Sequence, residues 1–248
     1  MTSERDFQAV QDAHWTEADA AHFAWTTREP GFAPVEDALL APLVATLAFP
    51  CLEIGCGEGT NLARLARGGP VVGIDRYPAK ARFAATAVPA ARVATADATA
   101  LPFADGAFAS VFIRDLLHHL PQPRRATAEA VRVLAPGGTL LVLEPNGANP
   151  LIALQGRLVA AEATLRTFRP TSVTDALVGL PLDDLRTTMA QGFPLRRLVL
   201  HHRFGVPALG RWRASATALA VLERGIEALL PRARWSYTVV RARRRRDG

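Results

Sequence analysis

Residues rich in apolar side chains fall into short runs that alternate with segments of helical periodicity. Continuous apolar runs are typical of strands covered on both faces, and they lie at 51–54, 71–75, 92–97, 110–115 and 139–145. Apolar residues spaced by three and four positions predict helices at 35–48, from Leu62 onward, at 78–88 and at 124–134. Strands that alternate with helices in this way predict a doubly wound, parallel α/β sheet.

The pattern changes on both sides of this central part. Residues 3–30 are helix-like and rich in aromatics, which fits a lid over a ligand as well as a helix packed on the sheet edge. Beyond residue 145 the alternation stops, and the pattern predicts helices at 150–166, 181–191 and 207–230 and strands at 195–202 and 235–243. We expect the apolar stripe of 207–230 to pack on the sheet or on the segment above it. Because no repeat or linker interrupts the chain, residues 1–248 are predicted to form one domain.

Composition and charge narrow the class of protein. A length of 248 residues with 49% apolar and 21% charged residues fits a globular domain. Two cysteines are too few for a disulfide framework, and we see no signal peptide and no spanning apolar run, so we expect a cytoplasmic protein. The net charge of +6 is concentrated near a basic tail at 241–248. We interpret this tail as a solvated terminus, with weak attraction to an anionic membrane as the alternative.

The most specific chemical signal is the turn CLEIGCGEGTN at 51–61. Gly55, Gly57 and Gly59 alternate there, and glycines let a ligand approach the backbone where a Cβ would collide. A dinucleotide fingerprint, G-x-G-x-x-G, would need its third glycine where Thr60 stands. The spacing of these glycines therefore differs from that of a dinucleotide fingerprint.

Acidic side chains follow three of the predicted strands. Glu53, Asp75 and Asp97 each lie at or beside a strand end. Ligands bind beyond the carboxyl ends of strands in such sheets. One of these residues alone could be a helix cap, but three at successive strand ends favour a ligand site.

Several ordered motifs resemble the class I S-adenosylmethionine-dependent methyltransferases. They are E-x-G-x-G-x-G in the glycine turn, VVGID, ATADATALPFADGAF and APGGTLLVLEP. The segment FASVFIRDLLHHL is similar to that of the quinone-biosynthesis C-methyltransferase branch, with Ala109 where those proteins usually have Asp. The resemblance covers about 35–145. It implies a Rossmann-like, seven-stranded, mostly parallel sheet with its last strand antiparallel, and S-adenosylmethionine as the cofactor, with S-adenosylhomocysteine as the product.

The resemblance also implies which residues contact the cofactor. The methionyl part would meet Gly55, Gly57, Glu53 and the segment Arg114–Asp115, the ribose would meet Asp75, and the adenine would meet Arg76, Asp97 and the backbone of Ala98. The full set of implied cofactor-binding residues is Glu53, Gly55, Cys56, Gly57, Asp75, Arg76, Asp97, Ala98, Arg114 and Asp115.

Two histidines after the fourth predicted strand, His118 and His119, are the candidate general bases. The alternative is that one packs and caps the next turn while the other is exposed, and catalysis by positioning alone is the favoured mechanism. Asn146 and Asn149 either face the acceptor or form a turn. We predict no metal site, because adjacent histidines lack the usual spacing of metal ligands.

The predicted function is methyl transfer to a small organic or lipid-like acceptor. The regions implied are a helical lid at 1–34, a cofactor-binding core at 35–145, substrate-cap insertions at 146–194 and 207–230, and the tail. Nucleic acid is a disfavoured partner, because no basic stripe interleaved with aromatics runs through the core. The alternatives are a non-catalytic scaffold with the same fold, or an NAD(P)-dependent oxidoreductase.

Overall fold

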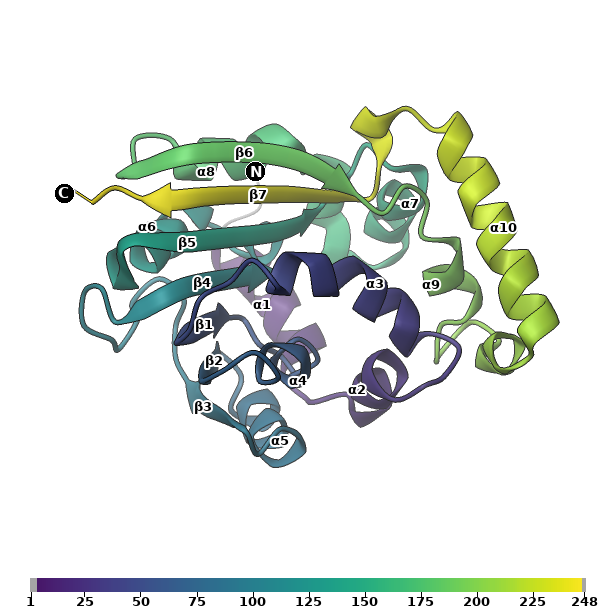
Figure 1. The fold of residues 1–248 in the computed structure, drawn as a ribbon, viewed down its shortest axis with the longest axis horizontal. Helices are drawn as coiled ribbons and strands as arrows, with labels where there is room; N and C mark the ends of the chain where they lie inside the picture. Colours follow the sequence, from purple (N-terminus) through teal and green to yellow (C-terminus); the bar gives the residue numbers. More distant parts are fainter. Residues whose placement is uncertain (1–3, 247–248) are drawn as a thin grey trace.

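A seven-stranded sheet forms the centre of the computed structural model, which describes residues 4–246 (Figure 1). Within these residues the strand order is β3-β2-β1-β4-β5-β7-β6. The strands are β1 (Cys51–Ile54), β2 (Val71–Asp75), β3 (Ala91–Thr95), β4 (Phe108–Arg114), β5 (Leu134–Pro145), β6 (Leu182–Ala190) and β7 (Tyr237–Arg244). β1 to β5 pair in parallel, and β7 lies antiparallel between β5 and β6. The predicted fold class is confirmed.

The register brings the carboxyl ends of the central strands to one edge. Ile54 at the end of β1 pairs with Ile74 of β2 and with Ile113 of β4. Every residue of β1 is buried, as its apolar run predicts for a strand covered on both faces. The segments that follow β1, β2 and β4 therefore begin side by side.

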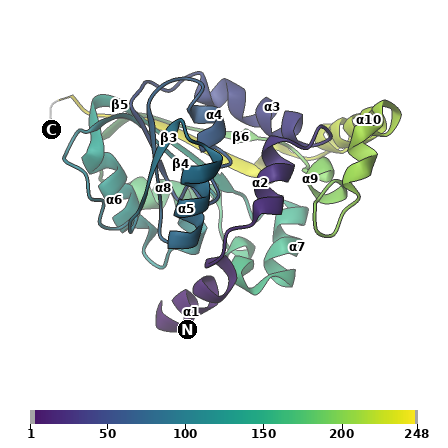
Figure 2. The same cartoon turned by 90° about the horizontal axis from the view of Figure 1, so that it is seen from below.

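Helices cover both faces of the sheet, and Figure 2 shows α3 on one side of the strands and α6 and α8 on the other. Before the third strand the helices are α1 (Glu4–Trp15), α2 (Ala20–Thr27), α3 (Ala33–Val44), α4 (Leu62–Leu65) and α5 (Pro78–Ala87). The later ones are α6 (Pro123–Val133), α7 (Pro150–Leu158), α8 (Pro170–Leu177), α9 (Leu195–Val199) and α10 (Arg213–Leu229). Short 3-10 helices are η1 (Leu117–His119), η2 (Ala160–Arg166), η3 (Pro207–Arg211) and η4 (Arg232–Arg234).

Two segments after the core have the opposite structure to the one predicted. The predicted helix at 181–191 is the edge strand β6, and the predicted strand at 195–202 contains helix α9. Most of β6 is exposed, so its polar side chains show no alternation, and it is held by its backbone ladder to β7. The apolar run at 195–202 is too short for its periodicity to distinguish helix from strand.

Other helix predictions were right in kind but wrong in extent. Residues 3–30 form two helices, α1 and α2. The predicted helix 150–166 is divided at Val159 into α7 and η2, and the predicted helix 207–230 is divided at Trp212 into η3 and α10.

Helix α10 buries its apolar stripe only in part, so the packing that we expected is found at some positions. Leu219 packs against the cluster formed by Trp25, Phe32, Val35 and Leu200, and Ile226 is half-buried. Leu222 of the stripe is 54% exposed, and Glu223 is the single fully buried residue of α10 among those the structure describes. In Figure 1 the helix extends away from the sheet. No helix within residues 4–246 is both long enough and apolar enough to cross a membrane.

The basic tail is not a frayed terminus over its described part. Residues up to Arg244 belong to β7, whose neighbours are β5 and β6. Arg244 donates to the carbonyl oxygen of Arg132 at 2.9 Å, and Arg245 forms an ion pair with Asp183. Residues 247–248 of the predicted tail lie outside the described residues.

Candidate active site

The glycine turn after β1 is an open loop with a left-handed backbone at its glycines. Gly55 and Gly57 have φ angles of 76° and 53°, which side chains rarely adopt. The N–H of Gly57 donates to Oδ2 of Asp75 at 2.9 Å, which fixes the turn to the end of β2. A Cβ on Gly57 would meet no atom of the described residues within 4 Å. One side of the turn is therefore open enough for a ligand to approach the backbone.

Glu53 places a buried carboxylate under this turn. Its Oε1 accepts from Asn61 Nδ2 at 2.7 Å, while Oε2 is buried and has no hydrogen-bond partner within residues 4–246. Burial raises the pKa of Glu53 to about 8, against the opposing effect of Asn61 and Arg114. A buried oxygen without a partner is costly, so this atom suits a hydrogen-bond donor brought by a ligand.

Cys56 belongs to the packing beneath the turn. Its Sγ lies 3.0 Å from the position that a Cβ on Gly73 would take, so the thiol fills the space that this β2 glycine leaves. Burial raises its pKa. Both cysteines, Cys51 and Cys56, are buried free thiols. The side chain of Cys56 is a core group, and a contact with a ligand would involve its backbone.

Asp75 and Asp97 follow neighbouring strands and also hold their own turns. Asp75 accepts from the Tyr77 N–H at 2.9 Å, and burial raises its pKa. Asp97 accepts from the N–H and Oγ1 of Thr99, both at 2.7 Å. Burial opposes the charge of Asp97, but the bonds from Thr99 hold its pKa below the ordinary value. The helix-capping role that we weighed for Asp75 is not present, because the N-cap of α5 is Tyr77 and Asp75 holds the turn that precedes it.

The predicted adenine contacts lie beside these two carboxylates. Arg76 follows Asp75 directly, and its Nη1 donates to Oε1 of Gln8 at 3.2 Å. Ala98 is buried in the core cluster beside β3.

Arg114 is the last residue of β4 and Asp115 follows it, and the two side chains have different surroundings. The Arg114 guanidinium is buried and forms an ion pair with Glu36 at 2.8 Å, and it also contacts Asp115 and the Tyr237 hydroxyl. Burial opposes the charge on Glu36, but Arg114 and Arg197 lower its pKa to about 2. The Arg114 side chain is thus part of the structural core, and its carbonyl is what could border a ligand. Asp115 has a φ of 51°, and burial raises its pKa.

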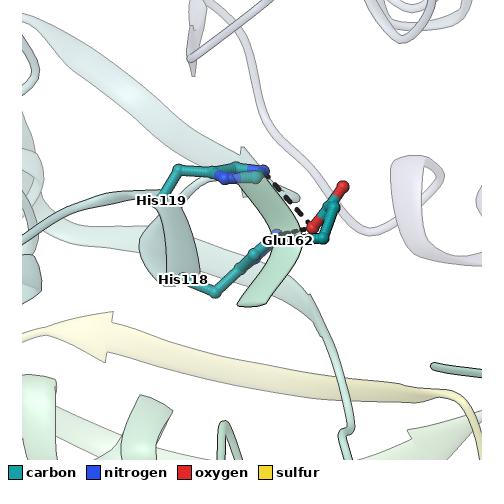
Figure 3. Close-up of side chains that lie close together, drawn as sticks. All are labelled: His118, His119 and Glu162. Carbon is teal, nitrogen blue, oxygen red and sulfur yellow. Dashed lines mark hydrogen bonds and ion pairs between the residues drawn. The ribbon is translucent and has the colours of Figure 1, made fainter. Parts of the chain in front are cut away.

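His118 is held between two carboxylates, as Figure 3 shows in part. Its Nδ1 lies 2.7 Å from Oε2 of Glu144 at the end of β5, and its Nε2 lies 3.2 Å from Oε2 of Glu162 in η2. Burial opposes a charge on the ring, but Glu144 and Glu162 raise its pKa to about 10. Both nitrogens are engaged by carboxylates, so His118 is the packed histidine of our alternative interpretation, but its ring caps no turn of the described residues and its neighbour His119 is not exposed.

His119 has the opposite character, although it is the next residue. Its ring lies 3.9 Å from that of His118 and 5.3 Å from that of Trp15, centroid to centroid. Burial and the charge on His118 lower its pKa to about 3. Its Nδ1 is buried with no hydrogen-bond partner among the described residues, and its Nε2 lies 3.9 Å from Glu162. His119 is the histidine of the pair that keeps a nitrogen lone pair available.

Three residues of this site were missed by the sequence interpretation. Glu144 follows the rule that found Glu53 and Asp75, since it lies at a strand end, and that signal could have identified it. Asn61 and Glu162 carried no such signal, because only the folded chain brings them to Glu53 and His118.

Asn146 and Asn149 do not contact the acceptor through their side chains, since these hold the chain turn after β5. The Asn146 amide donates to the carbonyl oxygens of Ala233 and Trp235 at 2.9 Å each. Asn149 caps α7 and donates to Gly192 and Arg234. The turn-forming role is confirmed, and the prediction that they face an acceptor was wrong, because their polar atoms are already occupied.

Helix α1 crosses from the cofactor side of the site to the histidine side. Gln8 and Asp12 bind Arg76 and Tyr77, the two residues after β2. Gln11 donates to the carbonyl of Ala161 at 2.8 Å, next to Glu162. The segment is therefore placed where the predicted lid would lie.

Known proteins are similar to this chain in sequence. A family model described as a methyltransferase domain matches residues 52–142. A demethylmenaquinone methyltransferase of Thermus thermophilus is 33% identical over 180 residues, which cover 64% of this chain and 79% of that protein. An uncharacterized 37.1 kDa protein in a Streptomyces fradiae transposon is 37% identical over 115 residues, which cover 44% of this chain but 33% of that protein.

Solved structures share the fold. Phosphoethanolamine N-methyltransferase 2 of Haemonchus contortus, in complex with S-adenosyl-L-methionine, has a TM-score of 0.68 at 17% identity. The match covers 96% of this chain and 60% of that one. At this level of identity the likeness concerns the fold alone.

Proposed function

This chain belongs to the class I S-adenosylmethionine-dependent methyltransferases, and from that membership we propose that it transfers a methyl group from this cofactor to a small organic or lipid-like acceptor. The bound sulfonium supplies an activated methyl group. The protein then has to hold the acceptor in line with the S–CH3 bond and exclude water, and positioning of this kind can supply about 7–11 kcal/mol.

The residues around the glycine turn fit the cofactor. The open side of Gly57 can admit the methionyl group, and the buried Oε2 of Glu53 can accept from its ammonium. Asp75 would accept from the ribose hydroxyls, while Arg76, Asp97 and the Ala98 backbone would surround the adenine. One observation carries this proposal. Oε2 of Glu53 is buried beside the open glycine turn and has no hydrogen-bond partner within residues 4–246.

The acceptor side is formed by the segments that follow β4 and β5. The Thermus relative is named for demethylmenaquinone, a lipid-like quinone. This name supports an apolar acceptor for the present chain, with α7, η2 and α8 as the segments that choose it. His118 and His119 as general bases stay a prediction, and positioning alone is the mechanism that we favour.

The surroundings of the protein are proposed from two observations. The buried free thiols of Cys51 and Cys56 fit a reducing compartment, which supports a cytoplasmic location. Weak attraction to an anionic membrane also stays a prediction. The arginines at 241–246 that would carry this attraction belong to β7 and to the residues just after it, and they do not form a free tail.

Calorimetry with S-adenosylhomocysteine and with NADH tests the proposed cofactor. We expect micromolar binding of S-adenosylhomocysteine and none of NADH. Asp75→Ala should weaken that binding by ~1.5–3 kcal/mol, the usual loss for hydrogen bonds to a charged group. Asp183→Ala, which removes an exposed carboxylate of the edge strand β6, is the matched control and should bind as the wild type does. Tight NADH binding without any affinity for S-adenosylhomocysteine would overturn the proposal.

A further inference from the structure

Three side chains from two separate elements lie close together at the edge of the sheet where the glycine turn is found. His118 and His119 come from η1 and Glu162 comes from η2, and one ligand atom from each lies within 4.8 Å of the others (Figure 3). We propose that His118, His119 and Glu162 bind a divalent transition-metal ion of the Zn²⁺ class. This site goes beyond methyl transfer, which does not require a metal for its donor chemistry.

The spacing of the ligand atoms is close to what such an ion needs. Metal–ligand distances of roughly 2.0–2.2 Å in a tetrahedral site place ligand atoms roughly 3.3–3.6 Å apart. Nε2 of His118 and Nε2 of His119 lie 3.2 Å and 3.9 Å from the same Glu162 oxygen. Because the three ligand atoms all lie within 4.8 Å of one another, the side chains would have to move closer together to reach tetrahedral spacing.

The ligands are already oriented by a second layer of hydrogen bonds. Glu144 binds Nδ1 of His118 at 2.7 Å, which is the carboxylate–histidine arrangement that directs Nε2 of a ligating histidine toward a metal. Glu144 is itself fixed by the N–H groups of Leu116 and Leu117, both at 2.8 Å. Gln155 donates to the other oxygen of Glu162 at 3.2 Å.

The charge balance favours a cation at the same point. Glu144 and Glu162 are buried carboxylates, at 0% and 6% exposure, and His118 is the one cationic group that both of them contact within the described residues. His119 adds a second imidazole, whose Nε2 lies 3.9 Å from the same carboxylate. A divalent ion that replaces the Nε2 proton of His118 would offset the surplus negative charge.

The donor set indicates which ions fit. Two imidazoles with one carboxylate suit Zn²⁺, Co²⁺ and Fe²⁺, whereas Mg²⁺ and Ca²⁺ prefer sites built from oxygen ligands. Three protein ligands leave one coordination position for a water or for an oxygen of the acceptor. The sequence could not reveal this site, because adjacent histidines looked unsuited to a metal and the third ligand lies in another element.

The test uses untagged full-length protein, stripped with a chelator and titrated with Co²⁺. We expect one equivalent to bind, with a visible absorption band typical of low-coordinate Co²⁺, and we expect Zn²⁺ to displace it while Mg²⁺ does not. His119→Ala and Glu162→Gln should each weaken binding at least about 100-fold. Glu144→Gln, which alters only the second layer, should weaken it about 10–100-fold.

His201→Ala is the matched control, because His201 and His202 form another adjacent histidine pair, and it should bind Co²⁺ as the wild type does. Circular dichroism checks that each variant is folded. If the wild type shows no saturable Co²⁺ absorption band, the proposal is overturned, whatever the variants show. Undiminished binding in folded His119→Ala protein overturns it as well. The affinity for S-adenosylhomocysteine, measured in chelator, reports separately on the proposed function.

Discussion

The carboxylate of Glu53 is the single group on which the chemistry of the glycine turn most depends. It is fully buried, one oxygen is held by Asn61, and the other has no partner within residues 4–246. Such a group favours its protonated form until a cation or donor arrives. Cofactor binding and ionisation of Glu53 should therefore be linked.

We predict a characteristic pH dependence of stability from this residue. The native pKa of about 8 exceeds the ordinary 4.5, so between these values the native state holds a proton that the unfolded chain has released. Raising the pH through this range therefore lowers the free energy of unfolding, by up to ~1.4 kcal/mol per pH unit. Glu53→Gln should lack this loss, so its stability relative to the wild type should grow from pH 5 to pH 8 in urea denaturation.

Glu29→Gln provides the comparison, since Glu29 forms an exposed pair with Arg211. Its stability should follow that of the wild type across the same pH range. Parallel curves for the wild type and Glu53→Gln would mean that Glu53 is already ionised in the native protein.

Residues near the glycine turn could be predicted because they follow a local rule. Glu53, Asp75 and Asp97 were found from strand ends, and the alternate glycines indicated where the chain turns. The partners of these residues could not be found in this way. Glu162 reaches His118, and Glu36 reaches Arg114, across stretches of chain whose relative placement only tertiary packing decides.

Among the elements, α1 holds the two halves of the site together. Trp15 at its end donates to Gln11 at 3.0 Å, and its ring lies 5.0 Å from Lys80 Nζ and 5.3 Å from the His119 ring. A ligand beneath the helix could leave only after these contacts open. These contacts fit the lid as well as the packed helix of our sequence interpretation, and the lid stays a prediction.

We expect Trp15→Ala to speed the dissociation of S-adenosylhomocysteine about 5–10-fold. The lost ring contacts amount to roughly 1–1.4 kcal/mol, and lids of this kind often set release rates. Surface plasmon resonance measures the dissociation rate. Val10→Ala is the control, because Val10 is on the same helix but 41% exposed. Unchanged dissociation from Trp15→Ala would show that α1 packs on the site without gating it.

After residue 145, the local sequence pattern failed to predict the type of two elements, β6 and α9. β6 is an exposed edge strand, so neither face carries the alternation that identifies a strand. α9 is five residues long, and its last residue Val199 and its C-cap Leu200 pack with Trp25 and Phe32 from the start of the chain. Tertiary partners rather than local preference decide both structures.

At the scale of the whole molecule, one buried ion network joins distant segments. Glu36 of α3 forms ion pairs with Arg114 of β4 and Arg197 of α9, and Tyr237 of β7 contacts Arg114. The network therefore ties the N-terminal helices and the segment after β6 to the centre of the sheet.

We predict that Glu36→Gln lowers the free energy of unfolding by ~3–5 kcal/mol, because buried Arg114 and half-buried Arg197 lose their shared partner. Since the native pKa of Glu36 is about 2, its contribution is complete above 4.5 and is lost as the pH falls from there toward 2. Guanidinium denaturation at pH 7 and pH 3 measures both effects. The exposed pair of Glu29 should contribute at most ~1 kcal/mol, and an equally small loss in Glu36→Gln would contradict the prediction.

The antiparallel strand β7 has a further consequence for the dynamics of the sheet. Among the described strands, β6 pairs only with β7, so its backbone amides depend on β7 for every ladder bond. Any opening that unfolds β7 must therefore also expose the amides of β6 that bond to it. In a hydrogen-exchange measurement, the protection of the β6 amides that bond to β7 should therefore not exceed the protection of the slowest β7 amides. The outermost strand of the sheet thus takes its protection from a neighbour that comes after it in the chain.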